Sequence, residues 1–133
     1  MQMNYEDYRS LPESLSIEEM ARLHGELTAE IGDDTDAAES YEELVVAAAK
    51  YAALRSNWYL WSREERMEQN DRRTSCHDVV VIKFDQLARF LKKQGKSAAW
   101  REVLGYEEIN PYCRKRIGDF ACYIVFIHCL LAR

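Results

Sequence analysis

The chain has 133 residues and a formal net charge of −5, with 47% apolar and 31% charged residues. This length is sufficient for one domain with one core, and this apolar share excludes an intrinsically disordered chain. Only two Pro and five Gly interrupt the sequence, which is too few turn residues for an all-β fold. The composition therefore predicts an all-α protein.

The charge is unevenly distributed along the chain. Residues 1–50 carry 13 acids and three bases, whereas residues 51–133 carry 10 acids and 15 bases. The basic excess of the second part is smaller than is typical of nucleic-acid-binding proteins. We expect the two parts to attract each other in the fold, and the acidic part to offer a protein-facing surface.

The start of the chain lacks the basic segment and apolar run of a secretion signal. No stretch reaches the roughly 18 apolar residues that a membrane-spanning helix requires. We therefore expect a cytoplasmic protein that does not contact a membrane, with its four Cys as reduced thiols.

Residues 1–15 are polar and predict an N-terminal arm, followed by one helical bundle domain over residues 16–133. Ser16 and Glu19 form a capping box, which predicts the start of a first helix that ends near Gly32. Thr35 or Asp36 is expected to cap the second helix. Its apolar stripe has helical spacing: Leu44, Ala47, Tyr51, Leu54, Trp58 and Trp61.

Two interpretations of residues 62–94 compete. A helix could begin near Ser75, or one long helix could begin at a capping box of Ser62 and Glu65 and end before Gly95. The long helix is favoured because one unbroken stripe crosses the disputed point. This stripe comprises Asn70, Arg73, His77, Val80, Phe84, Leu87 and Leu91.

Ser97 is expected to cap a short helix over residues 98–104, and Asn110-Pro111 to begin the last helix. Residues 120–132 contain no acid, Lys or Arg, so this helix is apolar on all sides. At about 20 Å it is too short for a hydrocarbon core of about 30 Å, which predicts a buried central helix. The expected fold is a single bundle of four long helices plus one short helix.

The cysteines of the last helix do not predict a metal site. Cys122 and Cys129 are separated by about 10 Å along the helix axis, too far for one zinc ion at a bond length of about 2.3 Å. We expect buried free thiols, and neither a metal nor another cofactor.

A group of polar residues is the main candidate site. Arg73 and His77 share one face of the long helix, next to Asp78, while Arg116 and Asp119 belong to the last helix. A charge inside a bundle needs a partner, so we expect Asp119 to pair with a basic residue of the long helix. This network either fixes the packing register, which we favour, or binds a carboxylate or phosphate.

An enzyme is one alternative. His24, His77, Asp78 and Asp119 follow the order of the metal ligands in HD-type phosphohydrolases, which are all-helical. Such a set would hold a divalent metal ion that activates water. Only the order of the residues matches, so this alternative ranks below a non-catalytic protein.

A nucleic-acid-binding protein is another alternative. Residues 90–118 have the rhythm of a helix-turn-helix, but the last helix becomes apolar on all sides after its first turn, which leaves no free recognition face. Bases in this region would contact phosphates: Lys92, Lys93, Lys96, Arg101, Arg114 and Lys115.

Part of the chain resembles a group of small all-helical bacterial proteins of unknown function, often found on mobile elements. The resemblance covers residues 70–121 and rests on Arg72-Arg73, His77-Asp78, Leu104-Gly105 and residues 116–121. It implies no activity, but it implies that Arg73, His77, Asp78 and Asp119 belong together. The expected function is a small non-catalytic protein-interaction or regulatory module, able to form a homodimer.

Overall fold

The computed structural model describes residues 15–105 and 113–131. Within these ranges it contains five helices and no strand, so the predicted all-α class with four long helices and one short helix is confirmed. The helices are α2 (Ile17–Ile31), α3 (Thr35–Trp58), α4 (Arg63–Lys93), α5 (Ala99–Leu104) and α6 (Cys113–Leu131). The predicted arm, except residue 15, and the predicted start at Asn110-Pro111 lie outside the described residues.

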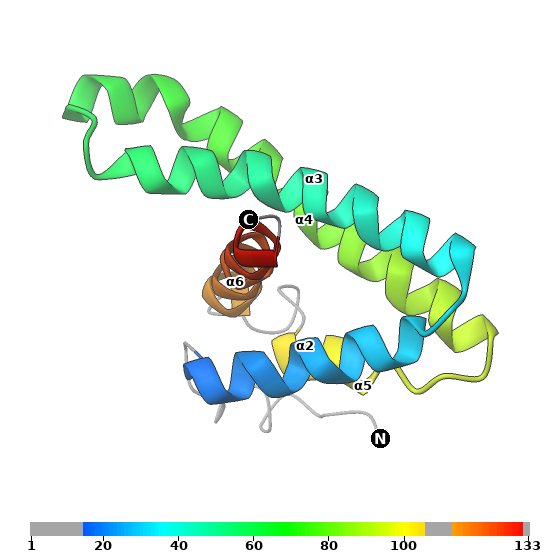
Figure 1. Cartoon of the computed structure of the whole chain (residues 1–133). Helices are drawn as coiled ribbons and strands as arrows, with labels where there is room; N and C mark the ends of the chain where they lie inside the picture. Colours follow the sequence, from blue (N-terminus) through cyan, green and yellow to red (C-terminus); the bar gives the residue numbers. More distant parts are fainter. Residues whose placement is uncertain (1–14, 106–112, 132–133) are drawn as a thin grey trace.

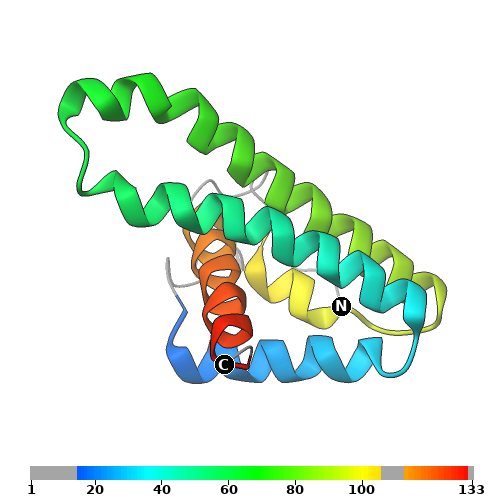
Figure 2. The same cartoon turned by 45° about the horizontal axis from the view of Figure 1, so that its top comes forward.

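Helices α3 and α4 form a long antiparallel hairpin, and its closed tip projects beyond the other helices (Figure 1). Helix α6 crosses this hairpin at a steep angle, so it is seen end-on in Figure 1 and lengthwise in Figure 2. Helices α2 and α5 pack on the far side of the core, at the end opposite the hairpin tip.

The ends of the helices follow their capping residues. Ser16 with Glu19 and Ser62 with Glu65 both form complete capping boxes, which confirms the single long helix over residues 63–93. Helix α3 is capped by Asp34, one residue earlier than predicted. Its carboxylate accepts the N–H of the third helical residue at 2.9 Å, so it satisfies a donor that would otherwise lack a partner.

The short helix α5 begins one residue later than predicted and is held by a carboxylate from α2. Ala98, not Ser97, is its N-cap, in a left-handed conformation with φ 49°. Glu30 accepts hydrogen bonds from the Ala98 N–H at 3.0 Å and from the Trp100 indole N–H at 2.7 Å. These bonds fasten the strained turn and α5 to the first long helix.

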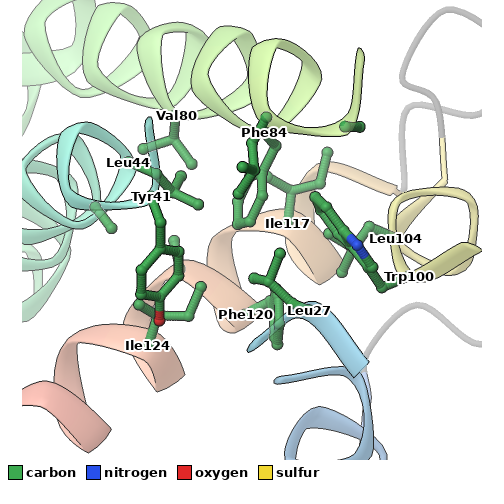
Figure 3. Close-up of a cluster of buried hydrophobic side chains, with 14 of the residues drawn as sticks. Leu27, Tyr41, Leu44, Val80, Phe84, Trp100, Leu104, Ile117, Phe120 and Ile124 are labelled. Carbon is green, nitrogen blue, oxygen red and sulfur yellow. The ribbon is translucent and has the colours of Figure 1, made fainter. Parts of the chain in front are cut away.

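The core lies where α4, α5 and α6 meet, as Figure 3 shows. Phe84 is fully buried, and its ring centroid lies 6.1 Å from that of Trp100 and 5.8 Å from that of Phe120. Aliphatic side chains from all five helices complete the cluster: Leu27, Leu44, Leu87, Leu104, Ile117 and Ile124.

Helix α6 is buried on one face only, which corrects the prediction of a helix enclosed on all sides. Ile117, Phe120 and Ile124 are fully buried, but Phe126 is 58% exposed and Cys129 is also exposed. Helix α6 packs mainly on α3 and makes smaller contacts with α2, α4 and α5, and these contacts leave the side chains of Phe126 and Cys129 open. None of the described helices combines the length and apolarity that crossing a membrane requires.

Candidate anion-binding site

A basic cleft of about 310 Å³ lies where the hairpin meets the first turns of α6. Four of its eight lining residues are cations, and the described residues that line it include no acid. The lining consists of Tyr51 and Arg55 from α3, Asn70, Arg73, Thr74 and His77 from α4, and Arg114 and Lys115 from α6.

The α3 wall of the cleft is built around an ion pair. Arg55 Nη2 donates to Asp119 Oδ1 of α6 at 2.5 Å, and both side chains are largely buried. Burial opposes the charge on Arg55, but the hydrogen bond and the charge of Asp119 outweigh it and raise the pKa of Arg55 above its usual value. Arg55 is therefore a fixed cation whose charge Asp119 balances.

Gly118 lets this wall approach α6 closely. A Cβ atom at this position would lie 2.8 Å from Tyr51 Oη and 3.1 Å from Arg55 Nη1. A larger residue would require the Tyr51 hydroxyl to move, because real Cβ atoms essentially never lie within 3.0 Å of another heavy atom, and it would crowd the Arg55 guanidinium. The glycine of the last helix is thus a condition for the shape of the cleft.

The α4 wall supplies a cation that has no carboxylate partner among the described residues. The guanidinium carbon of Arg73 lies 4.5 Å from the centroid of the Trp58 ring, which orients the side chain by a cation–π contact. Asn70 and Thr74 are one helical turn apart on the same face and add neutral hydrogen-bonding groups. The wall is positively charged and polar.

His77 positions the cleft. Its side chain is buried, and Nε2 donates to the main-chain carbonyl of Arg114 at 3.0 Å. Its ring packs edge-to-face against Tyr51, with the centroids 5.3 Å apart. His77 therefore joins all three helices and holds the first turn of α6 in place.

The α6 wall places bases where a helix ordinarily favours acids. The first turn carries Arg114 and Lys115 and no acid, although the helix dipole makes cations unfavourable at this end. Arg114 has only a distant pair with Asp78, at 3.9 Å between two exposed groups, which contributes little. An anion in the cleft would relieve this local electrostatic strain.

The structure brings together two members of the predicted polar network and separates the others. Arg73 and His77 line the cleft, whereas Asp78 is exposed beside it. Arg116 is buried and donates to the carbonyl of Val103, so it connects α6 to α5 instead.

The predicted partner of Asp119 is wrong. A basic residue of the long helix was expected to pair with Asp119, whereas its carboxylate pairs with Arg55 of α3. The physical reason is the packing of α6, which presents Asp119 to α3 and not to α4.

The bases proposed as nucleic-acid contacts also lie in different parts of the molecule. Arg114 and Lys115 line the cleft, but Lys92, Lys93 and Lys96 are exposed at the opposite end of α4. Nineteen residues separate Arg73 from Lys92, about 28 Å along the helix axis. The bases therefore do not form one continuous surface.

Arg101 is not available to a phosphate, which corrects its assignment. It is 2% exposed, and its Nε donates to Asp85 at 2.7 Å while Nη1 donates to the carbonyl of Gly105 at 2.7 Å. Its guanidinium is part of the structural core around α5.

The four residues of the alternative metal site do not meet. Within the described residues no group of three or more His, Cys, Asp or Glu could hold a metal ion, so the set of His24, His77, Asp78 and Asp119 is wrong. His24 instead shares a hydrogen bond of 3.0 Å with the hydroxyl of Tyr41. It lies on α2, while His77 points toward the start of α6.

A second histidine completes this arrangement on α2, α3 and α6. His128 Nε2 lies 3.1 Å from the same Tyr41 hydroxyl. Burial raises the pKa of Tyr41 to about 12, so the hydroxyl stays protonated. The cluster is a structural link between three helices.

Three residues of the site were not predicted from the sequence: Tyr51, Arg55 and Thr74. Arg55 carried a usable signal, because it follows Leu54 inside the apolar stripe of α3. A cation at such a position needs a partner, and Asp119 was the acid in the apolar end of the chain. The packing of α3 against α6 brings Arg55 and Asp119 together, and this packing is a property of the tertiary structure.

The fold and the cleft define a small all-α protein with a basic site between three helices, and the part of its lining that the structure describes contains no carboxylate. No protein family, curated protein or solved structure matches the chain. The resemblance to helical proteins of mobile elements therefore stays a prediction, and the function must be argued from the site itself.

Proposed function

We propose that the chain is a small, non-catalytic interaction module that binds an anionic group of a partner in the basic cleft. The observation that carries the proposal is the convergence of four cations from three helices on one cleft that has no carboxylate among its described lining residues. Guanidinium groups present forked N–H donors that match the oxygens of a phosphate or carboxylate. The anionic group is accordingly a phosphate or a carboxylate.

The balance of charge inside the cleft supports binding. Asp119 compensates Arg55, but Arg73 and Lys115 form no ion pair within residues 15–105 and 113–131. The cleft thus keeps a positive charge in a protein whose net charge is −5. Such a concentration of like charge is unfavourable alone and becomes favourable when an anion enters.

The chemistry of the lining supports a binding function over a catalytic one. The described lining residues include no Cys, no Ser and no carboxylate that could act as a general base. The Nε2 atom of His77 is engaged by a carbonyl, and the hydroxyl of Thr74 has no base bonded to it in the described part of the chain. The groups available are hydrogen-bond donors, which hold an anion without transferring it.

Nucleic acid is a less supported partner than protein. Arg114 and Lys115 are suitably placed, but Arg101 is buried and the three lysines near Gly95 lie at the other end of α4. A polynucleotide is usually held by a continuous run of cations. Homodimer formation and a cytoplasmic location stay predictions.

The proposal is tested by titrating the full chain with inorganic phosphate at constant ionic strength. Two-dimensional ¹H–¹⁵N NMR should show saturable shifts confined to residues of the cleft, including Tyr51, Arg73 and Lys115. The double variant Arg73→Gln/Lys115→Gln should weaken phosphate binding by about tenfold or more, because it removes two charge-assisted contacts.

A matched control removes the same charge elsewhere. Lys92→Gln/Lys93→Gln deletes two exposed cations from the far end of α4 and should leave the phosphate titration unchanged. Equal weakening in both double variants would show a non-specific electrostatic effect and would contradict the proposal. Absence of saturable shifts in the wild-type protein would contradict it as well.

A further inference from the structure

A second pocket adjoins the basic cleft on the side of the hairpin tip. It has a volume of about 320 Å³ and is lined by Trp58, Arg63, Arg66, Met67 and Asn70. Asn70 also lines the basic cleft, so the two hollows adjoin at this residue.

The adjoining pocket combines apolar surface with a basic rim. Met67 is 72% exposed although it is apolar, and Trp58 is only partly buried. Arg66 Nε donates to the carbonyl of Trp58 at 2.7 Å, which holds the end of α3 to the start of α4. The pocket can therefore receive an apolar group without rearrangement of the hairpin.

Arg73 connects the two parts. Its guanidinium lines the basic cleft and at the same time stacks on the ring of Trp58, which lines the adjoining pocket. A ligand whose anion is bound by Arg73 would bring its neighbouring group toward Trp58 and Met67. The arrangement suits a ligand that carries a charged and an apolar group side by side.

We propose, on the basis of the function proposed above, that the cleft and the adjoining pocket form one site for a phosphorylated peptide. The phosphorylated side chain enters the basic cleft, and a large apolar side chain near it in the peptide lies against Trp58 and Met67. Recognition of phosphorylated peptides by clusters of Arg is an established binding mode.

The number of cations favours a phosphate over a carboxylate. A phosphorylated side chain carries about −1.5 to −2 charges and three acceptor oxygens at neutral pH, whereas a carboxylate carries one charge and two oxygens. Arg73, Arg114 and Lys115 stand beside the compensated Arg55, so the cleft offers more donors than a carboxylate can use.

The surroundings favour a peptide over a polynucleotide. The other bases proposed as nucleic-acid contacts do not extend this surface, because Arg101 is buried and Lys92, Lys93 and Lys96 are exposed at the far end of α4. A polynucleotide is usually held by a continuous run of cations, whereas a single phosphorylated residue with an apolar neighbour requires only the cleft and the adjoining pocket.

The test uses the full chain and pools of degenerate nine-residue peptides with a fixed central phosphoserine, phosphothreonine or phosphotyrosine. Unphosphorylated pools and the oligonucleotide dT8 serve as comparisons. We expect retention of a phosphorylated pool at least about tenfold above its unphosphorylated counterpart, with enrichment of Leu, Ile, Met or Phe at one flanking position. Equal binding of dT8, or retention without a flanking preference, would overturn the inference.

Two variants separate the inference from the function on which it rests. Met67→Asp should abolish the flanking preference while the shifts caused by inorganic phosphate remain. Leu60→Asp introduces the same charge at an 82% exposed residue outside the pocket and should keep the preference. If phosphate binds in the cleft but no peptide pool is retained, the inference is wrong and the anion-binding function stands.

Discussion

The two ends of the α3–α4 hairpin differ in whether the charged side chains near them are buried and paired or exposed and unpaired within the described residues. At the α5 end, Arg101 is buried against Asp85 and the Gly105 carbonyl, and Glu30 accepts the indole N–H of Trp100. At the other end, Arg73 and Lys115 line an open cleft without a described carboxylate partner.

Apolar side chains show the same contrast. Phe84 and Trp100 are fully buried at the α5 end, whereas Tyr59, Leu60 and Met67 near the hairpin tip are more than 70% exposed. Polar and apolar groups are satisfied internally where they hold the fold together. They stay exposed at the other end, where the proposed binding site lies, so the groups that stabilise the fold and the groups proposed to bind a ligand occupy different ends of one hairpin.

The largest expected effect is at the centre of the closed end. Phe84→Ala should lower the free energy of unfolding by about 3 to 5 kcal/mol, because it removes a buried ring and leaves a cavity beside Trp100 and Phe120. Urea unfolding followed by circular dichroism measures the loss. Met67→Ala at the open end should change the same quantity by less than about 0.5 kcal/mol, and losses of equal size would remove the contrast.

The next effect compares two cations that the sequence alone did not distinguish. Arg101→Gln should cost about 2 to 3 kcal/mol of unfolding free energy, since it leaves Asp85 without its guanidinium and the Gly105 carbonyl without a donor. Thermal unfolding of this variant and of Lys92→Gln provides the comparison. A small and equal shift in both would mean that Arg101 is exposed in solution.

A smaller effect should appear as the pH falls. Burial lowers the pKa of His24, and the charge of His128 lowers it further, so the unfolded chain takes up the proton before the folded one. Stability is then complete above the ordinary histidine pKa of 6.5 and decreases as the pH falls through that value toward the lower folded pKa. Urea unfolding at several pH values measures this slope.

His24→Gln supplies the control for the pH dependence. It keeps a polar partner near the Tyr41 hydroxyl but cannot titrate, so the slope between pH 7 and 5 should become shallower. An unchanged slope would assign the pH dependence to other groups.

The smallest effect on stability belongs to the open end. Lys115→Gln should change the free energy of unfolding by no more than about 0.5 kcal/mol, and a slight gain is expected because a cation leaves the first turn of α6. Phosphate affinity should decrease at the same time. A variant that loses stability but keeps phosphate binding would reverse the roles assigned to the two ends.

Local signals in the sequence predicted the helices well. Ser62 with Glu65 predicted the start of α4, and the stripe through His77, Val80 and Phe84 predicted that the helix is continuous. Both signals are local, because capping and helical periodicity depend on neighbouring residues. The errors at α5 and α6 have a different origin. Glu30 reaches the α5 turn from 68 residues away, and the exposure of Phe126 depends on how the other helices pack around α6.

Only part of the candidate site could be predicted from the sequence. Arg73 and His77 could be paired because four residues separate them on one helix. Arg55 and Asp119 are separated by 64 residues, and their contact depends on how α3 crosses α6 at Gly118. Periodicity shows which residues share a face but not which faces meet.

The sequence by itself determined the class of fold, the extent of the long helices and the polar face of α4, since each follows from short-range propensity and spacing. Only the tertiary structure decided which cations would be buried and which would remain open. Arg101 lies in the short helix α5 and Lys115 in the first turn of α6, yet Arg101 is enclosed by Asp85 and Gly105 whereas Lys115 lines a cleft. Burial and pairing depend on contacts between distant parts of the chain, and these contacts place the anion-binding cleft between three helices.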